Sequence, residues 1–434
     1  MLQGQLVAEQ EFFFSFRFFK KLFAELGHKC HVVHNGAAFF VAEPIFGEPR
    51  GYLECVHLVN KGFFDKALDF IGCKQFPDVH FCNEKVVLIK DNFICFSYIS
   101  DMTNSLDFIG DVHGHCDELR ALLEKLGYVE SNGAYRYSGN ERTVVFLGDY
   151  VDRGSKVRET LNLVRAMRDA GTAVALMGNH EFNMLSFWQR NGAGGGHFLK
   201  KMKDSYLREH SFNKMAIHSR TVSDFVGRKQ EFLDALEFVK TLPIYLETET
   251  FRAQHACFDG AAVNALRREN ITCFADGNFD ELIARANDED CEYDDSLFVP
   301  MSTLLKGPEM PLPEGEHFTD AEGVRRVKTR IAWWVNPAKA SFRELCFQPG
   351  VSMDVQAEVL PQVRTRNFYG EKERPVFFGH YWLTGLPKLI RDNVCCLDFS
   401  VAGYRGNGHL VAYRFDGEPK LDERKFVFVE AVSR

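Results

Sequence analysis

The sequence lacks the patterns that mark several specialised classes of protein. Its twelve cysteines include no CxxC pair, so zinc-type cysteine spacing is absent. No apolar run reaches the roughly 18 residues that a membrane span needs. The N-terminus has no basic stretch followed by an apolar run and a small-residue cleavage site. We therefore expect a cytoplasmic protein with reduced thiols and no membrane partner.

The chain also lacks an excess of positive charge. Its formal net charge is −8, whereas the nucleic-acid backbone selects basic faces. We expect no dedicated nucleic-acid surface, although metals and arginines in one cleft would still bind a small phosphorylated or nucleotide substrate. With 434 residues and 45% apolar content, the chain can form one large domain with additions, or two domains.

Residues 1–101 differ in composition from the rest of the chain. They contain 17 of the 41 phenylalanines, clustered at Phe12 to Phe19, and five of the twelve cysteines. Three interpretations stay open, namely an amphipathic anchor, a small accessory domain and upstream sequence that is not normally translated. An anchor needs a sustained amphipathic pattern, so the other two are favoured. Met102 directly precedes the first regular strand pattern, and a domain could begin there.

From Leu106 onward the pattern becomes regular. Apolar runs predict strands at 106–109, 143–147 and 172–177, and side chains at helical spacing predict two helices between them, ending at Gly127 and Gly171. This alternation predicts an α/β fold with helices on the faces of a parallel or mixed sheet. Further strands are predicted at 244–247, 251–256, 376–378, 394–399, 410–415 and 426–429.

The proline-punctuated residues 261–374 are less regular and predict an insertion on the surface of the main domain. The predicted organisation is therefore an N-terminal extension at 1–101, a core at 102–260, the insertion at 261–374 and a return to the core at 375–434.

Polar motifs follow each of the first three predicted strands. They are Gly110-Asp111-Val112-His113-Gly114, Gly148-Asp149-Tyr150-Val151-Asp152-Arg153-Gly154 and Gly178-Asn179-His180-Glu181. The carboxyl ends of such strands are where α/β sheets bind ligands. Carboxylate, imidazole and amide groups suit manganese, iron or zinc. Two metals need a shared carboxylate, and Asp149, in the middle of the set, is our choice for it.

Together these motifs resemble the signature of the phosphoprotein phosphatase family within the calcineurin-like metallophosphoesterases. The most similar branch is bacterial and includes protein phosphatases, diadenosine tetraphosphatases and the phosphatase domains of polynucleotide kinase-phosphatases. The resemblance covers residues 105–185 strongly, and 250–260 and 376–415 through single histidine motifs. It implies an α/β (α+β) sandwich of mixed β-sheets flanked by helices, with a surface insertion.

The resemblance also implies the roles of individual residues. One metal would be held by Asp111, His113 and Asp149, and the second by Asp149, Asn179, His255 and His380. Two divalent ions are expected, with Mn²⁺ first and iron, zinc or nickel as alternatives. His180 resembles the general acid of the family, with Asp152 as its partner, and Arg153 would bind phosphate oxygens. For Asp152 and Arg153, a local ion pair is the alternative.

The sequence departs from the pattern in ways that affect the substrate. Eukaryotic protein phosphatases carry an arginine where this chain has Met177, and a second phosphate-binding arginine is not evident. Arg330 and Arg366 are candidates for it, although a basic strand edge is the common explanation of such residues.

Three functions are compared. The first is a metal-dependent phosphomonoesterase acting on phosphoserine or phosphothreonine in a protein, by direct attack of a metal-bridging hydroxide without a phosphoenzyme. The second is hydrolysis of a dinucleoside tetraphosphate or another nucleotide, for which Trp333, Trp334, Tyr381 and Trp382 would stack on a base. The third is a non-enzymatic, metal-stabilised binding module, which the presence of every ligand and of His180 disfavours.

Overall fold

The structure is a computed structural model that divides the chain into two units, Met1–Tyr98 and Ile99–Arg434. In the first unit it describes five strands, of which β1 (His28–His31) pairs with β2 (Val41–Pro44), and β3 (Val79–Cys82), β4 (Lys85–Lys90) and β5 (Phe93–Ile94) form a second antiparallel sheet. In the second unit it describes residues 105–432 except 140, 192–205, 291–295, 320–322, 324, 348–357 and 404–406. The phenylalanine cluster lies outside the described residues.

The second unit is built on a six-stranded mixed sheet. Strands β6 (Leu106–Ile109), β9 (Thr143–Phe146) and β10 (Ala173–Ala175) are parallel, as the strand–helix alternation predicted. Strand β21 (His409–Phe415) runs antiparallel beside β6 and is flanked by β20 (Asp398–Phe399) and β22 (Phe426–Glu430). The N-terminal and C-terminal parts of this unit therefore share one sheet.

A second sheet packs against the first. It contains β11 (Tyr245–Glu247), β12 (Arg252–Gln254), β18 (Val376–Phe378) and β19 (Val394–Cys396) in that order. Alternate side chains of both sheets fill a common core, in which the rings of Phe108 and Phe377 stack with centroids 3.8 Å apart. The first sheet is covered on both faces, so that all four residues of β6 and the last three of β9 are buried.

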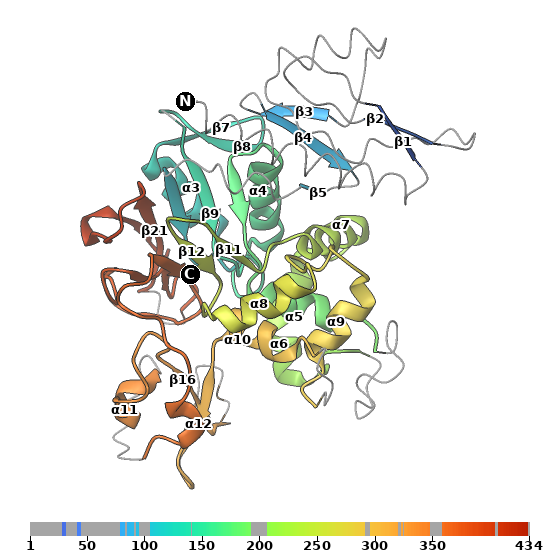
Figure 1. Ribbon diagram of the computed structural model, residues 1–434. Helices are drawn as coiled ribbons and strands as arrows, with labels where there is room; N and C mark the ends of the chain where they lie inside the picture. The colour runs from blue at the N-terminus through green and yellow to red at the C-terminus, as the bar shows by residue number, and fades with distance from the viewer. Residues whose placement is uncertain are drawn as a thin grey trace, which may run out of the picture. The chain divides into compact units, whose positions relative to one another are not determined.

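Helices cover the outer faces of the two sheets (Figure 1). Helix α3 (Cys116–Leu126) follows β6 and ends at Gly127, whose φ is +93°, and α4 (Val157–Asp169) follows β9. The remaining long helices gather below α4 in Figure 1. They are α5 (Asn179–Trp188), α6 (Phe212–Asp224), α7 (Lys229–Lys240), α8 (Gly260–Arg268), α9 (Phe279–Asn287) and α10 (Phe298–Lys306). Helix α6 packs against α4.

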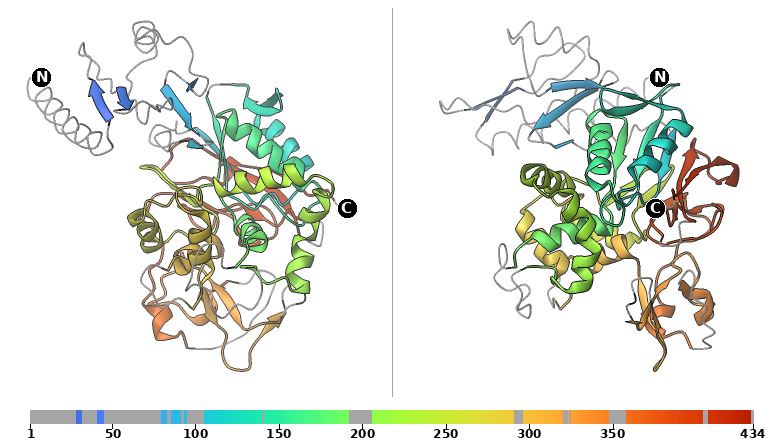
Figure 2. Two further views of the ribbon diagram at one scale, coloured as in Figure 1. Left: turned by 90° about the vertical axis from the view of Figure 1, so that its right-hand side faces the viewer. Right: turned by 180° about the vertical axis from the view of Figure 1, so that it is seen from behind.

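The proline-rich region contains two different parts. Side chains of α8, α9 and α10 belong to the main core, so this stretch is integral to the helical layer although it was predicted as part of the insertion. Residues 309–364 form a lobe with its own apolar core, drawn in orange in Figure 2. Its elements are β13 (Glu309–Pro311), β14 (Phe318–Thr319), β15 (Arg325–Arg326), β16 (Lys328–Ile331), α11 (Phe342–Leu345), β17 (Cys346–Phe347) and α12 (Pro361–Arg364).

The predicted strand at 394–399 is two strands in the structure. Strand β19 belongs to the second sheet and β20 to the first, so the chain crosses between the sheets at Leu397, which is fully buried. The remaining elements are the hairpin of β7 (Tyr128–Ser131) and β8 (Ala134–Tyr137) and the short helix η2 (Glu423–Lys425). Among the described residues, no helix has the length and apolar character of a membrane span.

Because the second unit begins at Ile99 and its first strand at Leu106, we predict that residues 1–101 are dispensable for folding of that unit and for its activity. A chain that begins at Met102 should be soluble, bind two metals and turn over a small aryl phosphate. A chain that begins at Cys116 is the matched control, because it loses a central strand and should not fold. Aggregation or inactivity of the Met102 chain, with an active full-length protein, would show that the boundary is wrong.

Candidate metal centre

Six candidate ligands converge where strands of the two sheets end. Asp111 and His113 follow β6, Asp149 follows β9, and Asn179 begins α5 after β10. From the second sheet, His255 follows β12 and His380 follows β18. All six side chains are buried, with at most 8% exposure. The three motifs and both later histidines predicted from sequence therefore lie in one place.

The loops that carry these ligands approach one another too closely for side chains at their glycines. A Cβ atom on Gly178 would lie 2.2 Å from Asp149 Oδ1, and one on Gly379 would lie 1.9 Å from Asp111 Oδ1. The ligands themselves adopt left-handed backbone conformations, with φ of +46° at His113, +55° at Asp149 and +69° at His380. Such conformations are uncommon outside glycine and cluster at functional sites.

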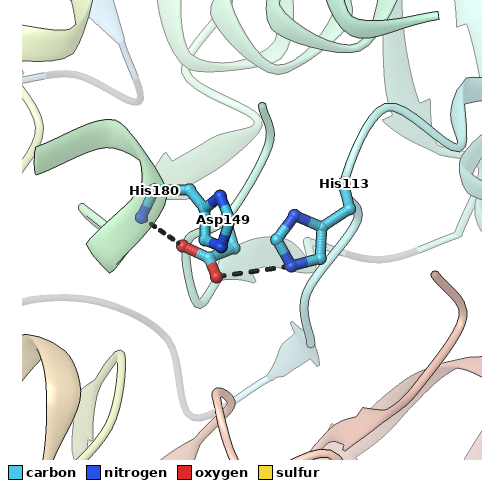
Figure 3. A group of neighbouring side chains, drawn as sticks. All are labelled: His113, Asp149 and His180. Carbon is cyan, nitrogen blue, oxygen red and sulfur yellow. Dashed lines mark hydrogen bonds and ion pairs between the residues drawn. The ribbon is translucent and has the colours of Figure 1, made fainter. Parts of the chain in front are cut away.

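Asp149 lies at the centre of the cluster. Its Oδ1 accepts a hydrogen bond of 2.9 Å from the backbone N–H of His180, and its Oδ2 lies 3.4 Å from Nε2 of His113; Figure 3 shows both contacts. The same Oδ2 lies 3.3 Å from Nε2 of His255. Burial alone would raise the pKa of Asp149, but the imidazoles of His255 and His180 hold it well below its usual range.

Two groups of side chains have the spacing of metal ligands. The first is His113, Asp149 and His180, and the second is Asp149, His255 and His380, with ligand atoms within 4.8 Å of one another in each group. Asp149 belongs to both, as expected for a shared carboxylate. Asn179 joins the second group, because its Oδ1 lies 2.9 Å from His255 Nε2 and 2.6 Å from His380 Nδ1.

The hydrogen bonds of the histidine ligands leave room for a cation between the ligand side chains. His113 Nδ1 donates to Val151 O and His255 Nδ1 donates to Leu147 O. The neutral imidazole of His113 therefore turns a lone pair at Nε2 toward the carboxylate of Asp149, and this buried nitrogen has no hydrogen-bond partner among the described residues. Opposed acceptors are satisfied when a metal lies between them. The set of imidazole nitrogens and carboxylate or amide oxygens suits a divalent transition metal.

The pKa of His255 reflects the same crowding of acceptors. Burial lowers it, but the carboxylates of Asp149 and Asp111 outweigh burial and raise it to about 10. A proton and a metal ion therefore compete for the same nitrogen.

Asp111 lies at the edge of the cluster and belongs to neither three-ligand group. Its two oxygens accept the backbone N–H of His380 at 3.2 and 3.1 Å. Burial, and after it the charge of Asp398, raises the pKa of Asp111 well above its usual value. A cation nearby would offset this crowding of carboxylates.

Asp152 connects His180 to a chain of buried polar groups. Its Oδ2 lies 2.6 Å from His180 Nδ1, and its Oδ1 accepts from His218 Nδ1 at 2.8 Å and from Thr221 Oγ1 at 2.6 Å. Trp188 Nε1 donates to His218 Nε2 at 3.0 Å. Because an indole N–H only donates, His218 carries its proton on Nδ1 and donates it to Asp152.

Asp152 remains a carboxylate in this network. Burial raises its pKa, but the hydrogen bonds from His180 and His218 outweigh burial and lower it. His180 Nδ1–H therefore points to Asp152, and Nε2 remains for the site. The guanidinium carbon of Arg153 lies 4.2 Å over the ring of Trp382.

Glu181, quoted in the third motif without a role, holds the site together. Its buried carboxylate accepts backbone N–H groups of Asp149 and Gly178 at Oε2 and of Tyr150 and Val151 at Oε1, over distances of 2.7 to 3.1 Å. Burial, and after it the charge of Asp149, raises the pKa of Glu181 to about 7. A glutamate at the third position of a helix often accepts the backbone N–H that precedes the helix, as Glu181 accepts that of Gly178, and this position is the signal that could have identified it.

The two candidate arginines differ in position. Arg330 Nη1 donates to His380 O at 3.0 Å, so the lobe that follows α10 reaches the metal cluster. Arg366 instead lies on a cavity of about 300 Å³ lined by Phe258, Trp333 and Tyr369, among others. Of the two, Arg330 is the one that contacts a predicted ligand.

Three of the four aromatic residues predicted to stack on a base are unavailable. Trp333, Trp334 and Tyr381 are at most 7% exposed and pack against Phe378 in the core. This part of the prediction is wrong because their large apolar rings are used to fill the core. Trp382 is half-buried and its ring lies 6.2 Å from that of His113, so it alone borders the site.

Known proteins resemble the region of the chain that carries the three motifs. Residues 105–260 match the family described as Calcineurin-like phosphoesterase. The asymmetrical bis(5'-nucleosyl)-tetraphosphatase PrpE of Oceanobacillus iheyensis is 40% identical over 101 residues, which are 23% of this chain and 40% of that protein. PrpE of Halalkalibacterium halodurans is 45% identical over 74 residues, 17% of this chain and 30% of that protein. The chain thus matches less than half the length of these relatives.

Among solved structures, two phosphatases resemble this chain at low identity. A cold-active protein-tyrosine phosphatase of a psychrophilic Shewanella species is 17% identical, with 74% of this chain and 81% of that chain covered and a TM-score of 0.35. A protein serine/threonine phosphatase from Saccharomyces cerevisiae is 13% identical, with 78% and 82% covered and a TM-score of 0.35.

We predict that Glu181→Gln destabilises the fold and weakens metal binding together. The amide cannot accept four N–H groups, so the free energy of unfolding should fall by about 3–5 kcal/mol and metal affinity by roughly 10–100-fold. Glu118→Gln is the matched control, because Glu118 is also buried but accepts one backbone N–H, that of Val432. Thermal unfolding and metal analysis measure both effects. Unchanged metal content and stability in Glu181→Gln would contradict the assignment.

Proposed function

We propose that this chain, whose residues 105–260 match the calcineurin-like phosphoesterase family, is a hydrolase of phosphoric ester bonds that uses two divalent metal ions, with Mn²⁺ as the first candidate. The observation that carries the proposal is the convergence of six buried oxygen and nitrogen ligands around Asp149. We assign the metals to Asp111, His113, Asp149, Asn179, His255 and His380. When bound, such ions activate water and offset the negative charge that develops on the phosphoryl group.

The residues of the chain supply the remaining functions. His180 donates its Nδ1–H to Asp152, and in its imidazolium form it would carry a second proton at Nε2 for the leaving oxygen. Arg153 offers a planar guanidinium for two phosphate oxygens, and its contact with the Trp382 ring fixes the orientation of that group. We propose Arg330 as the second arginine near the phosphate, because it binds the backbone of His380.

Two substrate classes are proposed. A phosphoserine or phosphothreonine monoester in a protein needs only the metal cluster, His180 and Arg153, and is the first candidate. A dinucleoside tetraphosphate is the second, and it is favoured by the activity named for the PrpE relatives. A cytoplasmic location is part of the proposal and rests on the sequence composition.

We predict that activity on an aryl phosphate disappears with a chelator and returns with Mn²⁺. The physical reason is that the candidate ligands are oxygen and nitrogen atoms, which cannot position water or a phosphoryl group without the ions. Full turnover after exhaustive removal of metal would contradict the proposal. Turnover of a phosphopeptide and of a dinucleoside tetraphosphate, measured side by side at the same free Mn²⁺, then decides between the two substrate classes.

We predict that His180→Asn lowers kcat by roughly 10²–10⁴ on an alkyl phosphate and leaves the metal content near that of the unchanged protein. The loss should be smaller on nitrophenyl phosphate, because a good leaving group needs no proton. His317→Asn, at an exposed position, is the control and should leave kcat unchanged. An equal loss on aryl and alkyl phosphates would argue against the role of His180 as acid.

A further inference from the structure

Two cations near helix α5 have no carboxylate partner among the residues that the structure describes. Arg208 precedes α6, and its Nη1 donates to Asn183 Oδ1 at 2.9 Å, while its backbone N–H donates to Ser186 O. Lys306 ends α10, and its Nζ lies 5.4 Å from the ring centroid of Phe182. Phe182 and Asn183 are neighbours on α5, so both cations lie against the same turn of that helix.

This turn of α5 adjoins the metal cluster. Asn183 follows the ligand Asn179 by four residues, so the two side chains lie on one face of the helix, about 6 Å apart along its axis. Arg208 therefore extends the ligand-bearing face of α5 by one turn. Burial lowers the pKa of Arg208, and the carboxylate of Asp152 is close enough to raise it.

The environment of the two cations is unfavourable without an anion. Burial, and after it the charge of Arg208, lowers the pKa of Lys306 to about 8. Burial also lowers the pKa of Arg208. Glu289 and Glu309 favour the charge of Lys306 from a distance, but in the described part of the chain neither Arg208 nor Lys306 forms an ion pair. Partly desolvated like charges in proximity are costly unless an anion binds between them.

We propose that Arg208 and Lys306 form a second anion subsite, which binds a further phosphate group of a substrate that carries several phosphates. This inference rests on the proposed function, because it takes the first phosphate to lie at the metal cluster. A guanidinium fork and an ammonium group are the side chains that bind phosphate oxygens best. Both are half-buried, so solvent and a ligand can reach them. The subsite therefore favours the second of the two proposed substrate classes, a polyphosphate ester such as a nucleoside polyphosphate.

Two non-hydrolysable probes test the subsite in the full chain loaded with Mn²⁺. Methylenediphosphonate carries two phosphonate groups and methylphosphonate carries one, and each is measured as an inhibitor of aryl phosphate turnover at constant free Mn²⁺. In Arg208→Gln and in Lys306→Gln, the ratio of the two inhibition constants should move by about 10-fold against the diphosphonate, as expected for the loss of one charge-assisted hydrogen bond. No change of the ratio, or an equal loss for both probes, would overturn the proposal.

Two further variants keep the result interpretable. Lys240→Gln is the matched control, because Lys240 also lies over an aromatic ring, that of Phe279 at 4.1 Å, but pairs with Glu237 on α7; it should leave the ratio unchanged. Asn183→Asp places a carboxylate beside Arg208 without removing the arginine, and it should weaken diphosphonate binding in the same direction. If the glutamine variants do not fold, this variant decides the question.

Failure of the subsite and failure of the proposed function give different results. Calorimetric titration of methylenediphosphonate into the unchanged protein and the variants needs no turnover. Binding that the variants weaken, in a protein without phosphatase activity, supports the subsite and removes the proposed function. Variants that raise KM for an acidic phosphopeptide while leaving the diphosphonate affinity unchanged would show that the cations recognise protein, which overturns the proposal.

Discussion

The position of the candidate ligands depends on a single buried carboxylate. Glu181 accepts four backbone N–H groups, three from the loop after β9 and one from the start of α5. Without this acceptor, those N–H groups would be desolvated with no partner, which costs more than a surface hydrogen bond contributes. The same bonds fix the loop that carries Asp149, and the loop after β6 is bound to it in turn, because Val112 and His113 donate to Asp149 O. Three strand ends are thus held as one unit before any metal binds.

Several residues around the metal cluster adopt unusual backbone conformations. His113, Asp149, Asp152, Arg153, His380 and Trp382 all have positive φ. Each such conformation costs roughly 1–2 kcal/mol outside glycine, and the packed core between the two sheets must offset that cost. The continuous burial of β6, β9 and β18 is therefore a condition for the site as well as for the fold.

The sequence predicted the parts of the site that depend on local pattern. Strand β6, Gly110 and Asp111 follow one another, so the local pattern predicted that Asp111 lies at a strand end, and the resemblance to a family supplied its proposed role as a ligand. The sequence pattern gives His218 no role, because its contact with Asp152 spans 66 residues and follows from the packing of α6. The sequence gives no sign of the role proposed for Arg208, because no local pattern marks an arginine that lies against a helix from an earlier part of the chain. The tryptophans at 333 and 334 were misplaced for a related reason, because an aromatic pair has the same local pattern whether it borders a site or fills a core.

The polar chain behind His180 links the fold to the proposed chemistry. Trp188 and Asp152 are separated by His218, and each hydrogen bond in the series determines the next, since the indole can only donate. Asp152 is left with its Oδ2 directed at His180, whose ring then presents Nε2 to the site. Neither Trp188 nor His218 needs to contact a substrate for this to hold. The helical layer that contains α5 and α6 therefore does more than cover a sheet: it orients the imidazole of the residue proposed to protonate the leaving oxygen, and it carries the cations that extend the site beyond the metals.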